Sequence, residues 1–132
     1  MMKHTKNSGG AKLPPIVEKH YEFCAWLIEK VGKFPKDQRF LLGDRIERHA
    51  LDILEMLIEA SLTSSRDGKA EILRGANVRL EHLRYMMRLA KDGKFININS
   101  FHFACERMEE IGRMIGGWIK SRQVYEKSGI KD

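Results

Sequence analysis

Hydrophobic residues recur every three or four positions along most of the chain, a spacing that places them on one face of an α-helix. Four such stripes are present: Val17, Tyr21, Cys24, Ile28 and Val31; Ile46, Ala50, Ile53, Leu57 and Ala60; Leu73, Ala76, Leu80, Leu83, Met87 and Ala90; and Phe101, Ala104, Met108, Ile111, Ile115 and Trp118. No segment sustains the period-two alternation of a strand. The pattern therefore predicts four amphipathic helices and no sheet.

Breaks between the stripes set the predicted helix boundaries. Gly32 suits a left-handed cap after the first helix, and the second begins near Pro35 or Lys36, because the residue before proline is pushed out of the helical region. A polar loop over residues 62–68 precedes the third helix, which ends at Asp92-Gly93-Lys94. Ser100 is the expected N-cap of the fourth helix.

Short connections between helices of this length predict an all-α fold, an antiparallel up-down-up-down four-helix bundle. The three-four spacing predicts shallow, left-handed crossing angles. With 132 residues, the chain has the size of one domain. We expect a disordered basic tail over residues 1–13, the bundle over 14–122 and a C-terminal tail over 123–132, where the apolar signal fades.

Composition narrows the class of protein. The chain is 42% hydrophobic and 32% charged, which is typical of a folded globular domain. Its longest apolar run, Phe23 to Ile28, is far shorter than the roughly 20 residues that cross a bilayer, and no secretory signal is recognisable. We therefore predict a cytoplasmic protein with no membrane contact. Cys24 and Cys105 lack metal-ligand spacing and are expected to be reduced thiols.

Positive charge is concentrated in the second half of the chain. The net charge is +6, and residues 66–132 hold fourteen Lys and Arg against nine Asp and Glu, whereas residues 1–65 hold ten against nine. Such a balance favours an acidic partner such as nucleic acid.

One helix carries most of the candidate contact residues. Arg84, Arg88 and Lys91 stand at positions i, i+4 and i+7 of the third helix, and Arg74 and Arg79 lie further up. Clustered basic side chains of this kind can track phosphates, although an ordinary solvated face has the same composition. Lys120 and Arg122, behind the fourth stripe, extend the candidate surface.

Catalytic and metal-binding patterns are missing. A helical bundle that holds a metal uses paired Glu-x-x-His ligands, which this chain lacks, and His102 with Glu106 is its only helical i,i+4 pair of this type. Neither a nucleophile elbow nor a phosphate-cradling glycine loop occurs. We expect no catalytic residues, no metal and no cofactor.

Glycines in the fourth helix need a compensating role, because each costs up to about 1 kcal/mol relative to alanine. Gly112, Gly116 and Gly117 expose bare backbone, so another helix could approach closely, either within the bundle or from a second subunit. Trp118 follows directly and can serve the core or a subunit contact.

Several segments resemble the accessory variability determinant (Avd) family of diversity-generating retroelements. The most specific is Gly-Arg-x-x-Gly-x-Trp-Ile over residues 112–119, followed by Phe-Pro-x-x-x-Arg over 34–39 and the stretches 42–47 and 83–90. The resemblance covers about Val17 to Ser121. The same four-helix family includes proteins encoded in intervening sequences of large-subunit ribosomal RNA genes, so a structural or interaction protein of that type, with an unknown partner, is the alternative.

This resemblance implies a homopentamer of four-helix bundles that does no chemistry itself. It would bind the retroelement's reverse transcriptase and template RNA, with DNA or an RNA/DNA hybrid as further candidate ligands, and support mutagenic synthesis of complementary DNA. By the matched positions, Arg84, Arg88 and Arg113 are candidates for the charged contact surface. Gly112, Gly116 and Trp118 are candidates for close helix packing.

Overall fold

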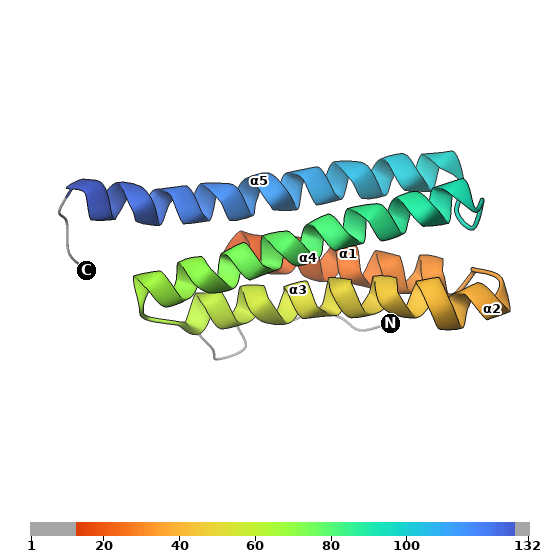
Figure 1. Cartoon of the computed structure of the whole chain (residues 1–132), viewed down its shortest axis with the longest axis horizontal. Helices are drawn as coiled ribbons and strands as arrows, with labels where there is room; N and C mark the ends of the chain where they lie inside the picture. The colour runs from red at the N-terminus through yellow and green to blue at the C-terminus, as the bar shows by residue number, and fades with distance from the viewer. Residues whose placement is uncertain (1–12, 129–132) are drawn as a thin grey trace.

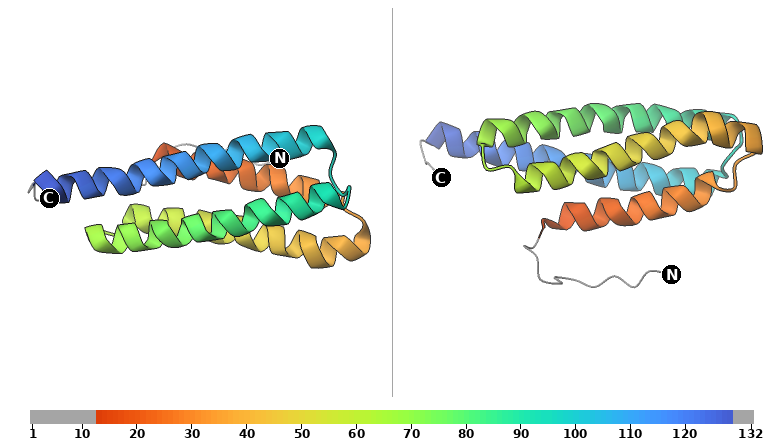
Figure 2. Two further views of the ribbon diagram at one scale, coloured as in Figure 1. Left: turned by 45° about the horizontal axis from the view of Figure 1, so that its top comes forward. Right: turned by 90° about the horizontal axis from the view of Figure 1, so that it is seen from below.

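The computed structural model describes residues 13–128, with side chains described through Ser121. Four long helices account for most of this chain: α1 (Pro15–Val31), α3 (Asp44–Leu62), α4 (Arg66–Asp92) and α5 (Ile98–Ser128). Successive long helices run in opposite directions (Figure 1). Helix α4 lies between α3 and α5, and α1 packs against α3 and α5 (Figure 2). The predicted all-helical, four-helix arrangement is confirmed for the described residues, in which no strand occurs.

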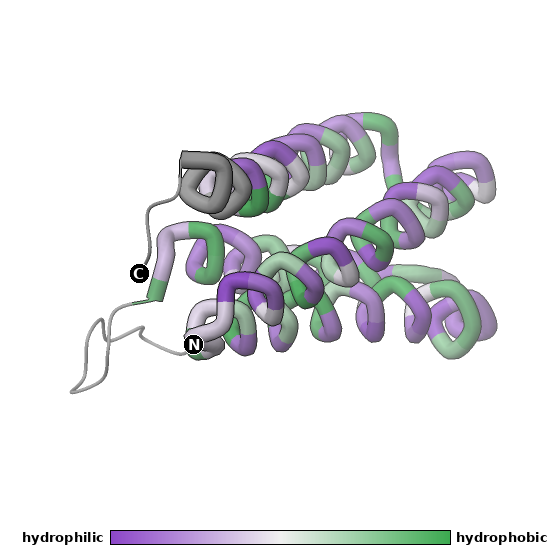
Figure 3. Tube along the Cα trace, turned by 60° about the vertical axis from the view of Figure 1, so that its left-hand side comes forward, coloured by the Kyte–Doolittle hydropathy of each residue, from purple (hydrophilic) through white to green (hydrophobic). Residues whose placement is uncertain are grey.

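The core consists of the side chains that these helices turn toward one another. Hydrophobic and hydrophilic positions alternate along each helix in Figure 3. Every residue of the second and third predicted stripes is buried. Within the described part of the chain, no helix is both long and apolar enough to cross a membrane.

Helix α1 is rotated relative to the predicted stripe. Ile28 is 47% exposed and Tyr21 is only half-buried, whereas His20, Phe23 and Leu27 face the core. The reason is a polar residue at a core position: His20 is fully buried and its Nε2 donates a hydrogen bond to the Ala50 carbonyl of α3, 2.8 Å away. A hydropathy pattern assigns such a histidine to the surface.

The connection from α1 to α3 contains a segment that the sequence did not predict. A short helix, α2 (Lys36–Gln38), begins where expected, directly after Pro35, but continues into a π-helical turn, η1 (Arg39–Gly43), before α3. This wide turn leaves Phe40 72% and Leu41 63% exposed, while Leu42 is buried. Gly43 is required here because a Cβ on it would lie 2.6 Å from Val31 Cγ1.

Two cap predictions were wrong, those at Gly32 and Ser100, whereas α4 ends at Asp92 as predicted. Gly32 has φ −59°, a right-handed conformation, so no left-handed cap ends α1. The left-handed residue after α4 is Lys94 (φ 65°), whose neighbour Phe95 donates its N–H to the Ala90 carbonyl. Asn97, rather than Ser100, caps α5, because its Oδ1 accepts the Ser100 N–H at 2.8 Å. The α5 backbone also continues beyond Arg122 to Ser128.

Candidate nucleic-acid interface

The basic residues of α4 point in more than one direction. Arg79 faces α3, where its Nη1 lies 3.1 Å from Asp52 Oδ2. Arg84 faces α5, where its Nη2 donates a hydrogen bond of 3.2 Å to the Met108 carbonyl. These two side chains flank opposite sides of the helix, so the five predicted α4 residues do not form a single ridge.

Arg84 is the most constrained of these cations. Its Nε lies 3.6 Å from Glu81 Oε1 but has no hydrogen-bond partner. Its guanidinium lies over the bare backbone of Gly112, where an added Cβ would stand 2.8 Å from Nη2. The absence of a side chain at Gly112 thus gives Arg84 room to reach the α5 backbone.

Lys91 is also engaged on the α5 side. Its Nζ lies 5.1 Å from the centroid of the Phe101 ring and 3.2 Å from Asp92 Oδ1. Cation–π contact of this kind holds the ammonium near one position. Lys91 therefore ties the end of α4 to the start of α5, and an acidic neighbour partly balances its charge.

Arg74 and Arg88 are the exposed, unbalanced charges of α4. They are fourteen residues apart, close to four helical turns, and so lie on the same outer side of the helix. Among the described residues neither forms an ion pair, and Arg88 lies 6.0 Å from the ring of the exposed Tyr85. Free guanidinium groups spaced along one side are suited to phosphates on a polyanion.

Helix α5 adds a weaker basic contribution. Arg113 is about two-thirds exposed and pairs at 3.5 Å with Glu109, one turn away on the same surface. Lys120 is exposed near the end of the described side chains. The side chain of Arg122 lies outside the described residues.

Gly116 and Gly117 leave open space beside them in the part of the chain that the structure describes. A Cβ at either position would meet no heavy atom within 4 Å, in contrast to Gly112. Two roles were predicted for these glycines, close packing inside the bundle and contact with a second subunit. The structure excludes the first role for Gly116 and Gly117. Their backbone lies open on α5.

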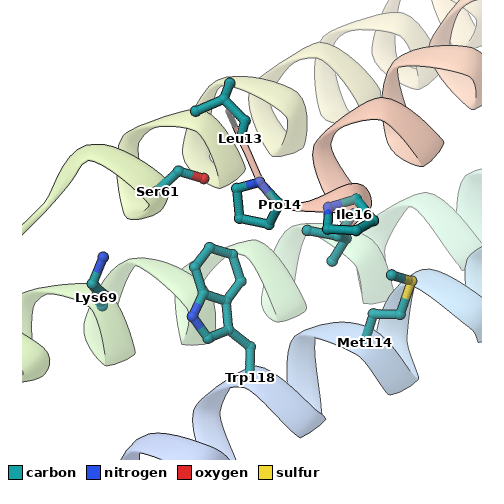
Figure 4. A pocket seen from close by; sticks show the side chains of 8 residues that line it. Leu13, Pro14, Ile16, Ser61, Lys69, Met114 and Trp118 are labelled. Atoms are coloured by element: carbon teal, nitrogen blue, oxygen red, sulfur yellow. The ribbon is translucent and has the colours of Figure 1, made fainter. Parts of the chain in front are cut away.

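Trp118 lines a groove at the end of the bundle where α1 begins. The groove encloses about 660 Å³. Figure 4 shows the indole directed from α5 toward Pro14, with Met114 further along the same helix and Ser61 and Lys69 on the far wall. Trp118 is half-buried and packs against the core, so its first role is structural.

A family model described as bAvd-like matches residues 15–122, which cover all four long helices except the end of α5. The chain belongs to the bAvd-like family. No curated protein and no solved structure gives a significant match. The match is consistent with an Avd-type protein, as the sequence motifs had indicated.

The structure gives the bAvd-like motif residues a physical meaning. Within Gly-Arg-x-x-Gly-x-Trp-Ile, Gly112 accommodates Arg84, Trp118 packs against the core, and Arg113 and Gly116 leave charge and backbone accessible. The motif therefore combines residues that stabilise the bundle with residues that remain available to a partner.

Two histidines that are not predicted site residues meet between α3 and α4. The rings of His49 and His82 contact each other, with centroids 5.4 Å apart. Burial lowers the pKa of His49, and the neighbouring His82 and Arg79 lower it further. In residues 13–121, no three His, Cys, Asp or Glu side chains gather where they could hold a metal ion, and both His102 and Glu106 are exposed.

The exposed apolar residues were also missed. Phe40, Leu41, Val78, Tyr85 and Leu89 are each more than half exposed. For α4, the signal was present in the sequence as a second stripe with three-four spacing, opposite the one that forms the core. For η1 no local signal exists, because the exposure depends on the π-helical turn.

Proposed function

We propose that this bAvd-like protein is a non-catalytic, cytoplasmic accessory subunit of a diversity-generating retroelement, which binds a reverse transcriptase and its template RNA. Membership of the family supports the accessory role. The observation that carries nucleic-acid binding is the pair Arg74 and Arg88, exposed on one side of α4 without an acidic partner among the described residues. DNA and RNA/DNA hybrid are bound through the same phosphate contacts.

The test is fluorescence-anisotropy titration of a structured RNA across a salt series. Replacing both Arg74 and Arg88 by Gln should weaken binding and reduce the slope of log affinity against log salt by about 1.5, because each phosphate contact contributes about 0.7 to 0.9. The matched control is Arg48→Gln, which removes one exposed guanidinium that Asp44 already balances at 2.8 Å. If the double variant behaves like this control, the assignment of the α4 arginines to RNA is refuted.

The homopentamer is part of the same proposal. Open backbone at Gly116 on α5 supports a close subunit contact there, since none of the described residues occupies it. Sedimentation velocity tests this directly: Gly116→Leu should dissociate the assembly while circular dichroism shows an intact fold. Unchanged mass would remove Gly116 from the interface.

Association with the enzyme calls for a different measurement. Where a reverse-transcriptase reading frame lies beside the gene, the two proteins should co-purify from a host in which both are expressed. A gene located instead inside a ribosomal RNA locus, with no such reading frame nearby, would favour the intervening-sequence type of protein.

A further inference from the structure

An apolar stripe runs along the outer side of α4, separate from the core stripe. Its apolar members are Val78, Tyr85 and Leu89, and His82 completes a spacing of four, three and four residues. Val78, Tyr85 and Leu89 are each about 55% exposed, and no element of the described chain covers them. This is the spacing with which one helix accepts the side chains of another.

The stripe leads into a groove at the η1 end of the bundle. The groove encloses about 580 Å³, and Leu89 belongs to both features. Leu41 and Leu42 of η1 form one wall, and Phe95 of the α4–α5 connection forms another. Together the stripe and the groove, which share Leu89, extend from the middle of α4 to the π-helical turn. We call it the α4 docking surface.

The unpaired charges on or beside the α4 docking surface are mainly positive. Arg45 lines the groove, and Arg74 and Arg88 flank the stripe; none of the three forms an ion pair among the described residues. Of the neighbouring acids, Asp92 lies 3.2 Å from Lys91 and Glu81 lies 3.6 Å from Arg84. Glu71, at the far end of the stripe, is a further exposed acid.

We propose that the α4 docking surface binds an amphipathic helix of a partner protein, one with aliphatic residues on one face and acidic residues beside them. Aliphatic side chains would fill the stripe and groove, and carboxylates would pair with Arg45, Arg74 and Arg88. A second copy that presented this same face would bring like charges together and be repelled, which favours a different protein as the occupant; a ring contact through another face is tested below by sedimentation mass. A nucleic acid would compete with the partner helix for Arg74 and Arg88 but would leave Val78, Leu89 and Leu41 in water.

This proposal names the surface that would bind the protein partner of the proposed function. It rests on the proposed function only in assuming that such a partner exists. The probe is a fluorescein-labelled, three-heptad helical peptide with Leu at the a and d positions and Glu at e and g. A sister peptide has Lys in place of Glu. Each is titrated with the full-length protein at peptide concentrations where the peptide alone is monomeric.

The acidic peptide should bind at least about tenfold more tightly than the basic one, and Leu89→Glu should weaken its binding by about tenfold or more. The control is Ile28→Glu, which makes the same kind of change at a 47% exposed site on α1. Equal binding of the two peptides, or equal effects of the two substitutions, would overturn the proposal.

Two further outcomes separate this surface from other occupants. If Leu89→Glu lowers the sedimentation mass of the protein, the surface is a contact between copies and the proposal is wrong. If the acidic peptide binds as expected while the RNA salt series shows no binding, the docking surface stands and nucleic-acid binding fails. If instead the two peptides bind equally while RNA binding depends steeply on salt, nucleic-acid binding stands and the docking surface fails.

Discussion

The contact between Arg84 and Gly112 predicts an energetic coupling between α4 and α5 that a double-mutant cycle can measure. The two perturbations are Arg84→Met, which keeps much of the aliphatic stem but loses the guanidinium, and Gly112→Ala, which adds a Cβ 2.8 Å from the position of Nη2. Both changes act on the same hydrogen bond to the Met108 carbonyl.

The magnitudes follow from this geometry. A hydrogen bond from a charged group contributes about 1.5 to 3 kcal/mol, and we take about 1 kcal/mol here because 37% of the Arg84 side chain is exposed. Arg84→Met should therefore lower the free energy of unfolding by about 1 kcal/mol. Gly112→Ala gains about 1 kcal/mol of helix propensity but displaces the guanidinium, so its net effect should be near zero.

In the double variant the alanine has no guanidinium to displace. Its helix propensity should then offset the loss at Arg84, so the double variant should have nearly wild-type stability, although adding the single effects predicts a loss of about 1 kcal/mol. The coupling is therefore about 1 kcal/mol, well above the ~0.3 to 0.5 kcal/mol scatter of independent sites.

Urea unfolding followed by circular dichroism at 222 nm, at one fixed protein concentration, measures all four proteins. The matched control cycle pairs Arg84→Met with Gly117→Ala, where no described atom lies within 4 Å of the new Cβ. That cycle should be additive. Additivity in the Gly112 cycle as well would refute the idea that this glycine makes room for Arg84.

The remaining predictions concern local stability. Burial lowers the pKa of His20 from its ordinary value of 6.5, with the Ala50 hydrogen bond opposing the shift; protonation therefore favours the unfolded chain, and stability should be full above pH 6.5 and fall as pH drops until the folded-state pKa is passed. His20→Gln should flatten this dependence in urea unfolding at about pH 7.5 and pH 5, and a profile parallel to wild type would assign the effect elsewhere. Asn97→Ala should lower the unfolding free energy by about 1 kcal/mol through loss of the α5 cap, whereas Ser100→Ala should change it little; a larger effect at Ser100 would contradict the observed cap. Leu57→Ala, at a fully buried site, should cost about 2 to 5 kcal/mol in the same assay, and a cost below about 1 kcal/mol would mean that this part of the core is loosely packed.

The sequence predicted those parts of the fold in which hydropathy alone decides which side of a helix is buried. For α3 and α4 every predicted core residue is buried, because the inward positions are all apolar. For α1 the inward face includes His20, whose imidazole is satisfied by a backbone carbonyl that only the tertiary structure supplies. The hydropathy pattern therefore predicted a buried face of α1 that is rotated relative to the observed one.

The candidate interface was predicted less completely, for a related reason. Helical spacing identified the basic residues of α4 but not the groups across the helix contacts. Asp52 balances Arg79, and the Met108 carbonyl holds Arg84, so their availability depends on residues 27 and 24 positions away in the sequence. Only Arg74 and Arg88 remain as the free cations of the predicted α4 set among the described residues.

The π-helical turn η1 sets the orientation of α3 relative to the segment before it, which contains the buried Phe34. The π-helical turn accommodates one residue more than a regular α-helical turn, and one residue corresponds to about 100° of rotation in an α-helix. If residues 36–62 formed a regular helix instead, the chain before Lys36 would be rotated by about 100° relative to α3. Phe34, which is 4% exposed and has its ring 5.9 Å from that of Phe95, would then leave its place at the end of the bundle. Deleting one residue within 39–43 would let this turn close into a regular helix with Phe34 still in place, whereas an unshortened segment forced into a regular helix would displace Phe34.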